Sequence, residues 1–254
     1  MVGDGSDAHP FCISMTSTAM LNTVSKLHSW VAPWVLHMDC TFKLNDNEFP
    51  LVILGVTDGA QQLHVLSISI VSHRTTEVYQ RVVQGLKDLV SKVLPQVTFM
   101  PAYVMTDAEL AERKALLSVF PEAQPLMCYF HVKKACEDKL RGNAEKELIL
   151  QDLTDLHSTL SQGEFDTKFS TMFRRWFVSS SDFALYFYHQ WVQGDFREWQ
   201  IFRSAPGVVS TNNAVERVLM ETSRNTLHAA NASNWVSCVV WVWCGFVATC
   251  CNCL

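Results

Sequence analysis

Three apolar runs with the length of β-strands follow one another early in the chain, at residues 34–44, 50–57 and 63–72. Two polar segments separate them, Asn45-Asp46-Asn47 and Asp58-Gly59-Ala60, and both have the composition of turns. Because connections this short join antiparallel neighbours, the pattern predicts a three-stranded meander.

The hydrophobic spacing around the meander alternates between helical and strand-like segments. These segments predict a strand at 10–15, a helix over 16–29 capped by Thr16 or Ser17, a helix over 75–94, a strand at 99–106, a helix over 108–119, a strand at 124–130 and a helix from about 132. From the meander onward the order is βββαβαβα, which predicts an α/β fold with a mixed sheet and helices on its faces. This is the order of the ribonuclease H-like fold, in which the first and fourth strands are neighbours.

Residues 143–209 show helical spacing throughout and carry many aromatic side chains, which indicates an all-helical insertion in the sheet domain. Aromatic residues at helical spacing more often form a core than a platform for stacking on nucleic acid. We divide the chain into an N-terminal approach segment at 1–32, the first part of the ribonuclease H-like core at 33–142, the helical insertion at 143–209, a catalytic helix at 210–232 and an atypical apolar, cysteine-rich tail at 233–254.

The tail is nearly uncharged between Trp235 and Cys251 and contains five of the nine cysteines. We interpret it first as a truncated or frame-shifted end, second as a buried core segment and third as a membrane span, because it barely reaches spanning length and has no basic flank. Cys251-Asn252-Cys253 resembles half of a zinc site, but the second half is absent, so we expect no complete zinc site.

Composition describes an ordinary globular protein, with 254 residues, 48% hydrophobic content and a net charge of -5. Proteins that bind DNA by themselves usually have a basic face, because neutralising phosphates supplies much of the affinity. Any binding to DNA must therefore use local basic patches or a further module. The N-terminal residues lack the pattern of a signal peptide, so we expect reduced cysteines in the cytosol or the nucleus.

Three acidic residues stand where metal-dependent phosphoryl transfer would need them. Asp39 and Asp107 each close an apolar run, and Glu216 follows Thr211 or Asn212, which would cap its helix. Acids that converge repel one another unless divalent cations neutralise them, and carboxylate oxygens suit Mg²⁺ or Mn²⁺.

Each acid also has a structural explanation. Asp107 directly precedes a predicted helix and is a candidate cap for it. Glu216 is a candidate first-turn acid, favoured there by the helix dipole. Asp39 has no capping role, because its strand continues past it. Asp58 precedes Gly59 in a hairpin turn, which explains that residue without a function.

A set of motifs in a fixed order resembles the MULE (Mutator-like element) transposase domain of the DDE type. The similarity runs from about residue 10 to residue 230. Its motifs are Asp39-Cys40-Thr41-Phe42-Lys43-Leu44, Gly55-Val56-Thr57-Asp58, Thr75-Thr76-Glu77-Val78-Tyr79, Thr106-Asp107-Ala108-Glu109, Phe120-Pro121-Glu122-Ala123, Cys128-Tyr129-Phe130-His131 and Thr211-Asn212-Asn213-Ala214-Val215-Glu216.

The resemblance implies a ribonuclease H-like fold whose acidic triad holds two Mg²⁺ or Mn²⁺ ions. The family's triad corresponds to Asp39, Asp107 and Glu216, which would cut DNA at transposon ends and join the 3′-hydroxyl to target DNA. The implied partners are transposon and target DNA and further copies of the chain, with no membrane, and the implied location is the nucleus. The family's zinc-binding DNA-recognition module, expected upstream, is missing from this sequence.

Cys128 and His131 match a Cys-x-x-His box that follows the second acid in this family. Two ligands do not complete a tetrahedral zinc site, so we expect an auxiliary role near the active site, or a packed cysteine and a capping histidine. Lys133 and Lys134 are candidates for contact with the DNA backbone, or they belong to a solvated face. Two rival functions stay open: a domesticated regulator without catalysis, and an inert interaction module left from a decayed element.

Overall fold

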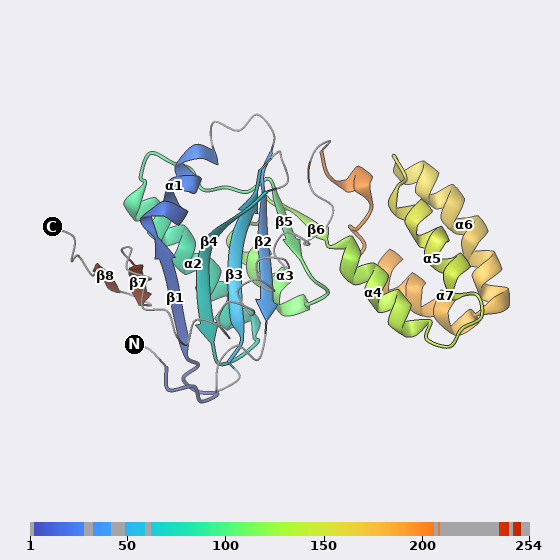
Figure 1. Ribbon diagram of the computed structural model, residues 1–254, viewed down its shortest axis with the longest axis horizontal. Coiled ribbons are helices and arrows are strands. Elements are labelled where there is room, and N and C mark those ends of the chain that lie inside the picture. Colours follow the sequence, from blue (N-terminus) through green and yellow to red (C-terminus); the bar gives the residue numbers. More distant parts are fainter. Residues whose placement is uncertain are drawn as a thin grey trace, which may run out of the picture.

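The computed structural model describes residues 3–27, 33–41, 49–58, 62–205 and 208, together with the backbone of 239–243 and 246–249. It has a mixed sheet covered by helices, and a separate group of helices beside one edge of this sheet (Figure 1). The first part comprises strands β1 to β6 with helices α1 to α3 and is called the sheet unit. The second, from α4 to Arg203, is called the helical unit.

The strands are short and mostly apolar. They are β1 (Cys12–Ser17), β2 (Val35–Thr41), β3 (Leu51–Thr57), β4 (Leu63–Val71), β5 (Tyr103–Thr106), β6 (Gln124–Met127), β7 (Val239–Trp243) and β8 (Phe246–Thr249). The helices are α1 (Thr18–Lys26), α2 (Thr76–Val93), α3 (Leu110–Val119), α4 (Tyr129–Lys139), α5 (Lys146–His157), α6 (Gln162–Ser179) and α7 (Ser181–Phe187), with a π-helix η2 (Tyr188–Val192) and a 3-10 turn η3 (Ile201–Arg203).

Two helices of the sheet unit begin at hydroxyl caps, and the first of these, Ser17, was one of the two caps predicted. The side chain of Ser17 accepts a hydrogen bond from the Met20 amide at the start of α1, and Thr75 accepts one from the Val78 amide at the start of α2. The apolar faces of α1, α2 and α3 then share one hydrophobic core with the sheet. This core fixes the orientation of the strands whose ends carry the acidic residues.

The order of strands in the sheet is β6-β5-β2-β3-β4-β1-β7-β8. β2, β3 and β4 are antiparallel neighbours, as the meander prediction requires. β5 pairs with β2 in parallel, and β6 pairs with β5 in parallel. The predicted adjacency of the first and fourth strands of the βββαβαβα series is therefore confirmed, and this mixed α/β arrangement is compatible with a ribonuclease H-like fold.

Two element boundaries differ from the sequence-based prediction. β5 begins at Tyr103 and not at residue 99, because Pro101 has no amide hydrogen for a central ladder. β6 ends at Met127, and α4 begins at Tyr129 and not near residue 132. Apolar residues continue from the strand into the helix at this point, so hydrophobicity alone gives no sign of the change.

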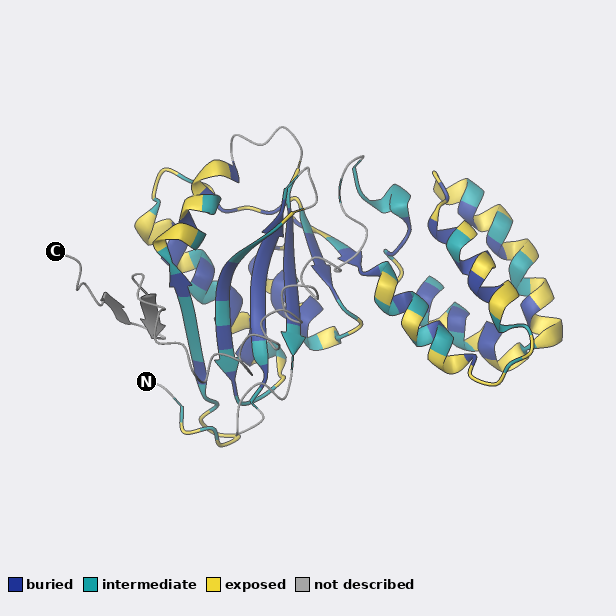
Figure 2. Cartoon of the chain, viewed as in Figure 1, coloured by how far each residue is buried: buried dark blue, intermediate teal, exposed yellow. Residues whose placement is uncertain are grey.

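The helical unit has a hydrophobic core of its own. Its buried aromatic side chains are Phe165, Phe169, Trp176, Phe183, Phe187, Trp191, Phe196 and Trp199. Many of these rings contact one another in edge-on or tilted geometry, as between Trp176 and Phe187, with centroids 5.3 Å apart. Figure 2 shows buried residues on the inner faces of the helices and exposed residues on the outer faces. The prediction that the aromatic residues form a core is confirmed.

The described part of the tail consists of two strands. β7 pairs antiparallel with β1, and β8 pairs antiparallel with β7. Among the described helices, none has the length and apolar character needed to cross a membrane. The predicted helix at 210–232 lies outside the described residues.

Candidate active site

Asp39 lies in the central strand β2 and is 4% exposed. Its Oδ1 atom accepts a hydrogen bond from the amide of Cys40, at 2.8 Å. The strand continues to Thr41, so this residue neither caps a helix nor forms a turn. A carboxylate buried in a sheet costs free energy unless nearby groups or a bound cation compensate for it, and Asp39 is for that reason a candidate ligand.

Asp107 reaches the same end of the sheet from the neighbouring strand. Met105 of β5 pairs in register with His37 of β2, so Asp107 and Asp39 are each two residues beyond the same paired position. Residues two apart on a strand point to the same face. The pairing of β5 with β2 therefore brings these two predicted site residues together near the same end of the two strands.

The capping explanation for Asp107 is wrong. Helix α3 begins at Leu110, and Glu109 takes the N-cap position without a side-chain cap hydrogen bond. Oδ1 of Asp107 instead lies 2.8 Å from Nδ1 of His131 in the first turn of α4. Asp107 is thus part of a contact between β5 and α4, and it is not needed to start its own helix.

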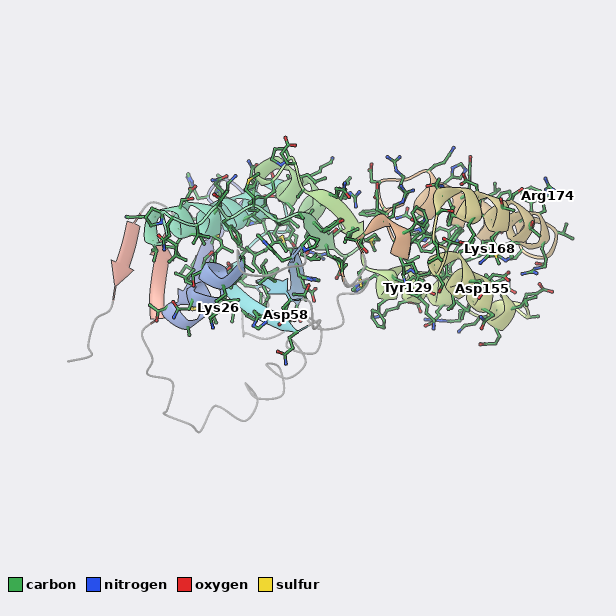
Figure 3. The ribbon with its side chains drawn as sticks, turned by 90° about the horizontal axis from the view of Figure 1, so that it is seen from above. Lys26, Asp58, Tyr129, Asp155, Lys168 and Arg174 are labelled. Carbon is green, nitrogen blue, oxygen red and sulfur yellow. The ribbon has the colours of Figure 1, made fainter. Side chains whose placement is uncertain are left out.

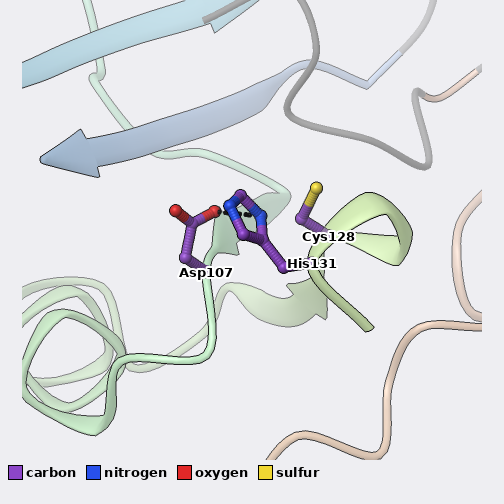
Figure 4. A group of neighbouring side chains, drawn as sticks. All are labelled: Asp107, Cys128 and His131. Carbon is purple, nitrogen blue, oxygen red and sulfur yellow. Dashed lines mark ion pairs between the residues drawn. The ribbon is translucent and has the colours of Figure 1, made fainter. Parts of the chain in front are cut away.

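Asp107, Cys128 and His131 form a compact group (Figure 4), and one ligand atom from each lies within 4.8 Å of the others. Burial by itself would lower the pKa of His131, but hydrogen bonds to Asp107 and Cys128 and the charge of Asp107 raise it to about 10. Cys128 holds the N-cap position of α4 without a side-chain cap hydrogen bond. His131 is therefore the partner of Asp107, and the capping role considered for it is wrong.

Glu112 is a further acid at this site that the sequence analysis missed. It lies on α3 and is 1% exposed. Its pKa is raised well above the ordinary value by burial and by the negative charges of Asp107, Glu109 and Asp39. Its Oε2 atom has no hydrogen-bond partner among the described residues. The sequence did contain a sign of this burial. Glu112 precedes Ala115, Leu116 and Val119 at the spacing of residues on the buried face of a helix.

Positive charge compensates this acidic group in part. Arg74, just before α2, forms an ion pair with Glu109 and lowers the pKa of Glu112. The hydroxyl of Tyr79 donates a hydrogen bond to Oε1 of Glu109, at 3.3 Å. Two cationic side chains, Arg74 and His131, therefore accompany four carboxyl groups in this part of the structure. These carboxyl groups belong to Asp39, Asp107, Glu109 and Glu112. The surplus of carboxyl oxygens fits hard divalent cations such as Mg²⁺ or Mn²⁺.

The remaining acidic residues are placed differently. Glu216 lies outside the described residues. Asp58 follows β3, where its Oδ1 accepts a hydrogen bond from the Gln62 amide and its Oδ2 lies 2.9 Å from Nε2 of His64. This local pairing agrees with a turn role for Asp58.

The basic side chains also separate into two groups. Lys133 is half-buried and Lys134 exposed, and neither has an ion-pair partner among the described residues. Arg175 forms an ion pair with Asp152 inside the helical unit. Arg174 is exposed at the end of the helical unit remote from the sheet, whereas Tyr129 lies where the two units meet (Figure 3). Lys133 and Lys134 follow His131 by two and three residues on α4, so they are the lysines of this helix that lie nearest in sequence to His131.

Residues 35–135 match the family model of the MULE transposase domain. This segment begins with β2, which carries Asp39, and ends in α4, which carries His131. A search of the curated proteins finds no match to the chain. Residues 35–135 are therefore similar to the MULE transposase domain, and this similarity suggests a function related to transposition.

Proposed function

We propose that the chain is the catalytic part of a DDE-type transposase, which cuts DNA and transfers strands at transposon ends with two divalent cations. One observation carries the proposal. Asp39 and Asp107 each lie two residues beyond the His37–Met105 pair of two adjacent parallel strands, and the negative charges of both raise the pKa of a buried acid, Glu112. Acidic groups gathered in this way bind cations, and a fold without this function would lose stability from their repulsion.

In this proposal Asp39 and Asp107 bind the cations through carboxylate oxygens, and Glu216 supplies the third acid of the triad. Bound Mg²⁺ or Mn²⁺ ions activate the attacking oxygen and stabilise the leaving oxygen in phosphoryl transfer. His131 orients Asp107 through the contact at 2.8 Å. Burial and the negative charges of Asp107, Glu109 and Asp39 raise the pKa of Glu112, whose Oε2 oxygen would be a further ligand for a bound cation.

DNA would approach the same edge of the sheet. Lys133 and Lys134 follow His131 on α4, and an ammonium group at this position can contact the phosphate backbone. The net charge of -5 provides no general attraction to DNA, so these local contacts carry more of the affinity. We further propose that the chain acts in the nucleus and works as a homo-oligomer on transposon ends and target DNA.

Nicking of supercoiled plasmid DNA tests the proposal. The purified chain is expected to nick DNA with Mn²⁺ or Mg²⁺ and to lose this activity with EDTA. Asp39→Asn keeps the size of the side chain but removes its charge, and it should lower the rate by at least about 100-fold, as loss of a main electrostatic contributor does. Asp58→Asn is the matched control, because Asp58 is an acid directly after the neighbouring strand β3 but pairs with His64.

The rival functions predict other results. DNA binding without any metal-dependent nicking supports a regulator that lost catalysis, and neither binding nor nicking supports an inert interaction module. Equal nicking by wild type and Asp39→Asn overturns the assignment of the site.

A further inference from the structure

Asp107, Cys128 and His131 offer three metal-ligating atoms of different chemistry. The carboxylate oxygen, the thiol sulfur and the imidazole nitrogen lie within 4.8 Å of one another (Figure 4). The sequence suggested only the two ligands of the Cys-x-x-His box, and the fold adds Asp107 from the end of β5.

We propose that Asp107, Cys128 and His131 bind one transition-metal ion of the Zn²⁺ class, at a site that shares Asp107 with the Mg²⁺ or Mn²⁺ site of the proposed reaction. Zn²⁺ takes sulfur, nitrogen and oxygen ligands in tetrahedral geometry, and three protein ligands leave the fourth position open to water. A thiolate with an imidazole selects such an ion over Mg²⁺, which prefers oxygen ligands alone.

Local structure brings these ligands to nearly the required positions. Cys128 and His131 are three residues apart at the start of α4, so their side chains lie on one face of the first turn. The ladder between β5 and β6 fixes this turn beside Asp107, because Thr106 pairs with Met127 and the Cys128 amide donates to the Thr106 carbonyl, at 3.1 Å. Cys128 is fully buried, and Asp107 and His131 retain partial exposure. This exposure provides a path by which an ion and its water ligand can enter.

Binding exchanges protons for the metal ion. The thiol proton of Cys128 and the proton between Asp107 and His131 pass to the buffer, and the ion takes their place. No electron is transferred. One consequence rests on the proposed function. A Zn²⁺ ion held by Cys128 and His131 would also bind Asp107 and withdraw it from the Mg²⁺ site, so Zn²⁺ should inhibit nicking.

Titration with Co²⁺ tests the site without any measurement of activity. The five cysteines from Cys238 onward are first replaced by serine, because they offer other thiolates to a metal ion. Co²⁺ bound to Cys128 should produce a thiolate-to-cobalt charge-transfer band and the visible bands of tetrahedral cobalt. Cys128→Ser should remove the charge-transfer band. His131→Asn and Asp107→Asn should each weaken binding by more than about 100-fold, since even loss of a partner behind a ligand costs 10–100-fold.

Cys136→Ser is the matched control. Cys136 is equally buried on α4, but it packs in the core of the helical unit. Circular dichroism shows whether each variant folds. Folded protein without the band, or a band that persists in Cys128→Ser, overturns the site.

Inhibition is then measured as the ratio of nicking rates with and without one equivalent of Zn²⁺. The ratio should fall well below one in the wild type and return towards one in Cys128→Ser. A chain that shows the cobalt band but never nicks DNA supports the metal site and contradicts the proposed function. A chain that nicks DNA but shows no band contradicts the metal site alone.

Discussion

Oδ1 of Asp107 lies 2.8 Å from Nδ1 of His131, and this pair joins the end of β5 to the first turn of α4. The contact holds a candidate metal ligand at the edge of the sheet and adds positive charge beside an acidic group. Helix α3 begins at a different residue, with Glu109 in the N-cap position and no side-chain cap.

The pair predicts a large change in the protonation of His131. Without cations, His131 should titrate with a pKa of about 10 in the wild type, because Asp107 stabilises the imidazolium. In Asp107→Asn the contribution of Asp107 is lost while burial and the contact with Cys128 remain, so the pKa should fall well below that of the wild type. NMR titration of the imidazole signals measures both values. A His131 pKa that stays near 10 in the variant contradicts the assigned partner.

Glu112→Gln separates stability from cation binding. The raised pKa of Glu112 means that folding at pH 7 costs free energy, because the unfolded chain holds this acid ionised in water. This cost is absent below the unfolded pKa of 4.5 and appears as the pH rises. The Gln variant should therefore be more stable than the wild type at pH 7, but Mn²⁺ should stabilise it less. Chemical denaturation with and without Mn²⁺ measures both effects, and exposed Glu122→Gln should change neither.

His157 predicts acid sensitivity in the helical unit. Burial lowers its pKa to about 4, although the Nδ1–H group donates a hydrogen bond to the Trp199 carbonyl, at 2.7 Å. The unfolded chain binds a proton at pH 6.5 and the folded chain only near pH 4, so stability falls between these values as the pH decreases. The full loss is about 3 kcal/mol. His157→Asn keeps a donor near the Nδ1 position, and its unfolding free energy should depend less on pH in this window.

Asp152 is the buried polar anchor of the same unit. Its Oδ2 accepts a hydrogen bond from the Trp176 indole, at 2.7 Å, and pairs with Arg175. Asp152→Ala leaves a buried indole N–H without its acceptor and should lower the unfolding free energy by about 1 to 3 kcal/mol. Asp155→Ala, at an exposed position on the same helix, is the control and should have a much smaller effect. Equal effects of the two substitutions in urea denaturation refute the anchoring role.

The sequence predicts the sheet unit well, because apolar runs separated by turns set both the strands and their antiparallel pairing. The adjacency of Asp39 and Asp107 also follows from the order of elements, since the crossover through α2 places β5 beside β2. The cap of α1 was also predicted, since Ser17 was one of the two candidates named for it.

The sequence does not reveal contacts that depend on how helices pack on the sheet. Glu112 looks like an ordinary charged residue of a helix until α3 is placed against the strand ends, although its position in the apolar stripe was a usable signal. Likewise, the Cys-x-x-His box predicts two ligands and gives no sign of Asp107 as a third. The hydrophobic pattern does not show that α4 begins at Tyr129, because the strand before this helix is equally apolar.

Direct binding of Mn²⁺ tests most closely the claim that Asp39 and Asp107 form one cation site. Electron paramagnetic resonance of free Mn²⁺ counts bound ions in the wild type, Asp39→Asn, Asp107→Asn and the control Asp58→Asn. We predict that each of the first two substitutions weakens binding by more than about tenfold and that Asp58→Asn binds as the wild type does. Wild-type affinity in both Asp39→Asn and Asp107→Asn would contradict the account.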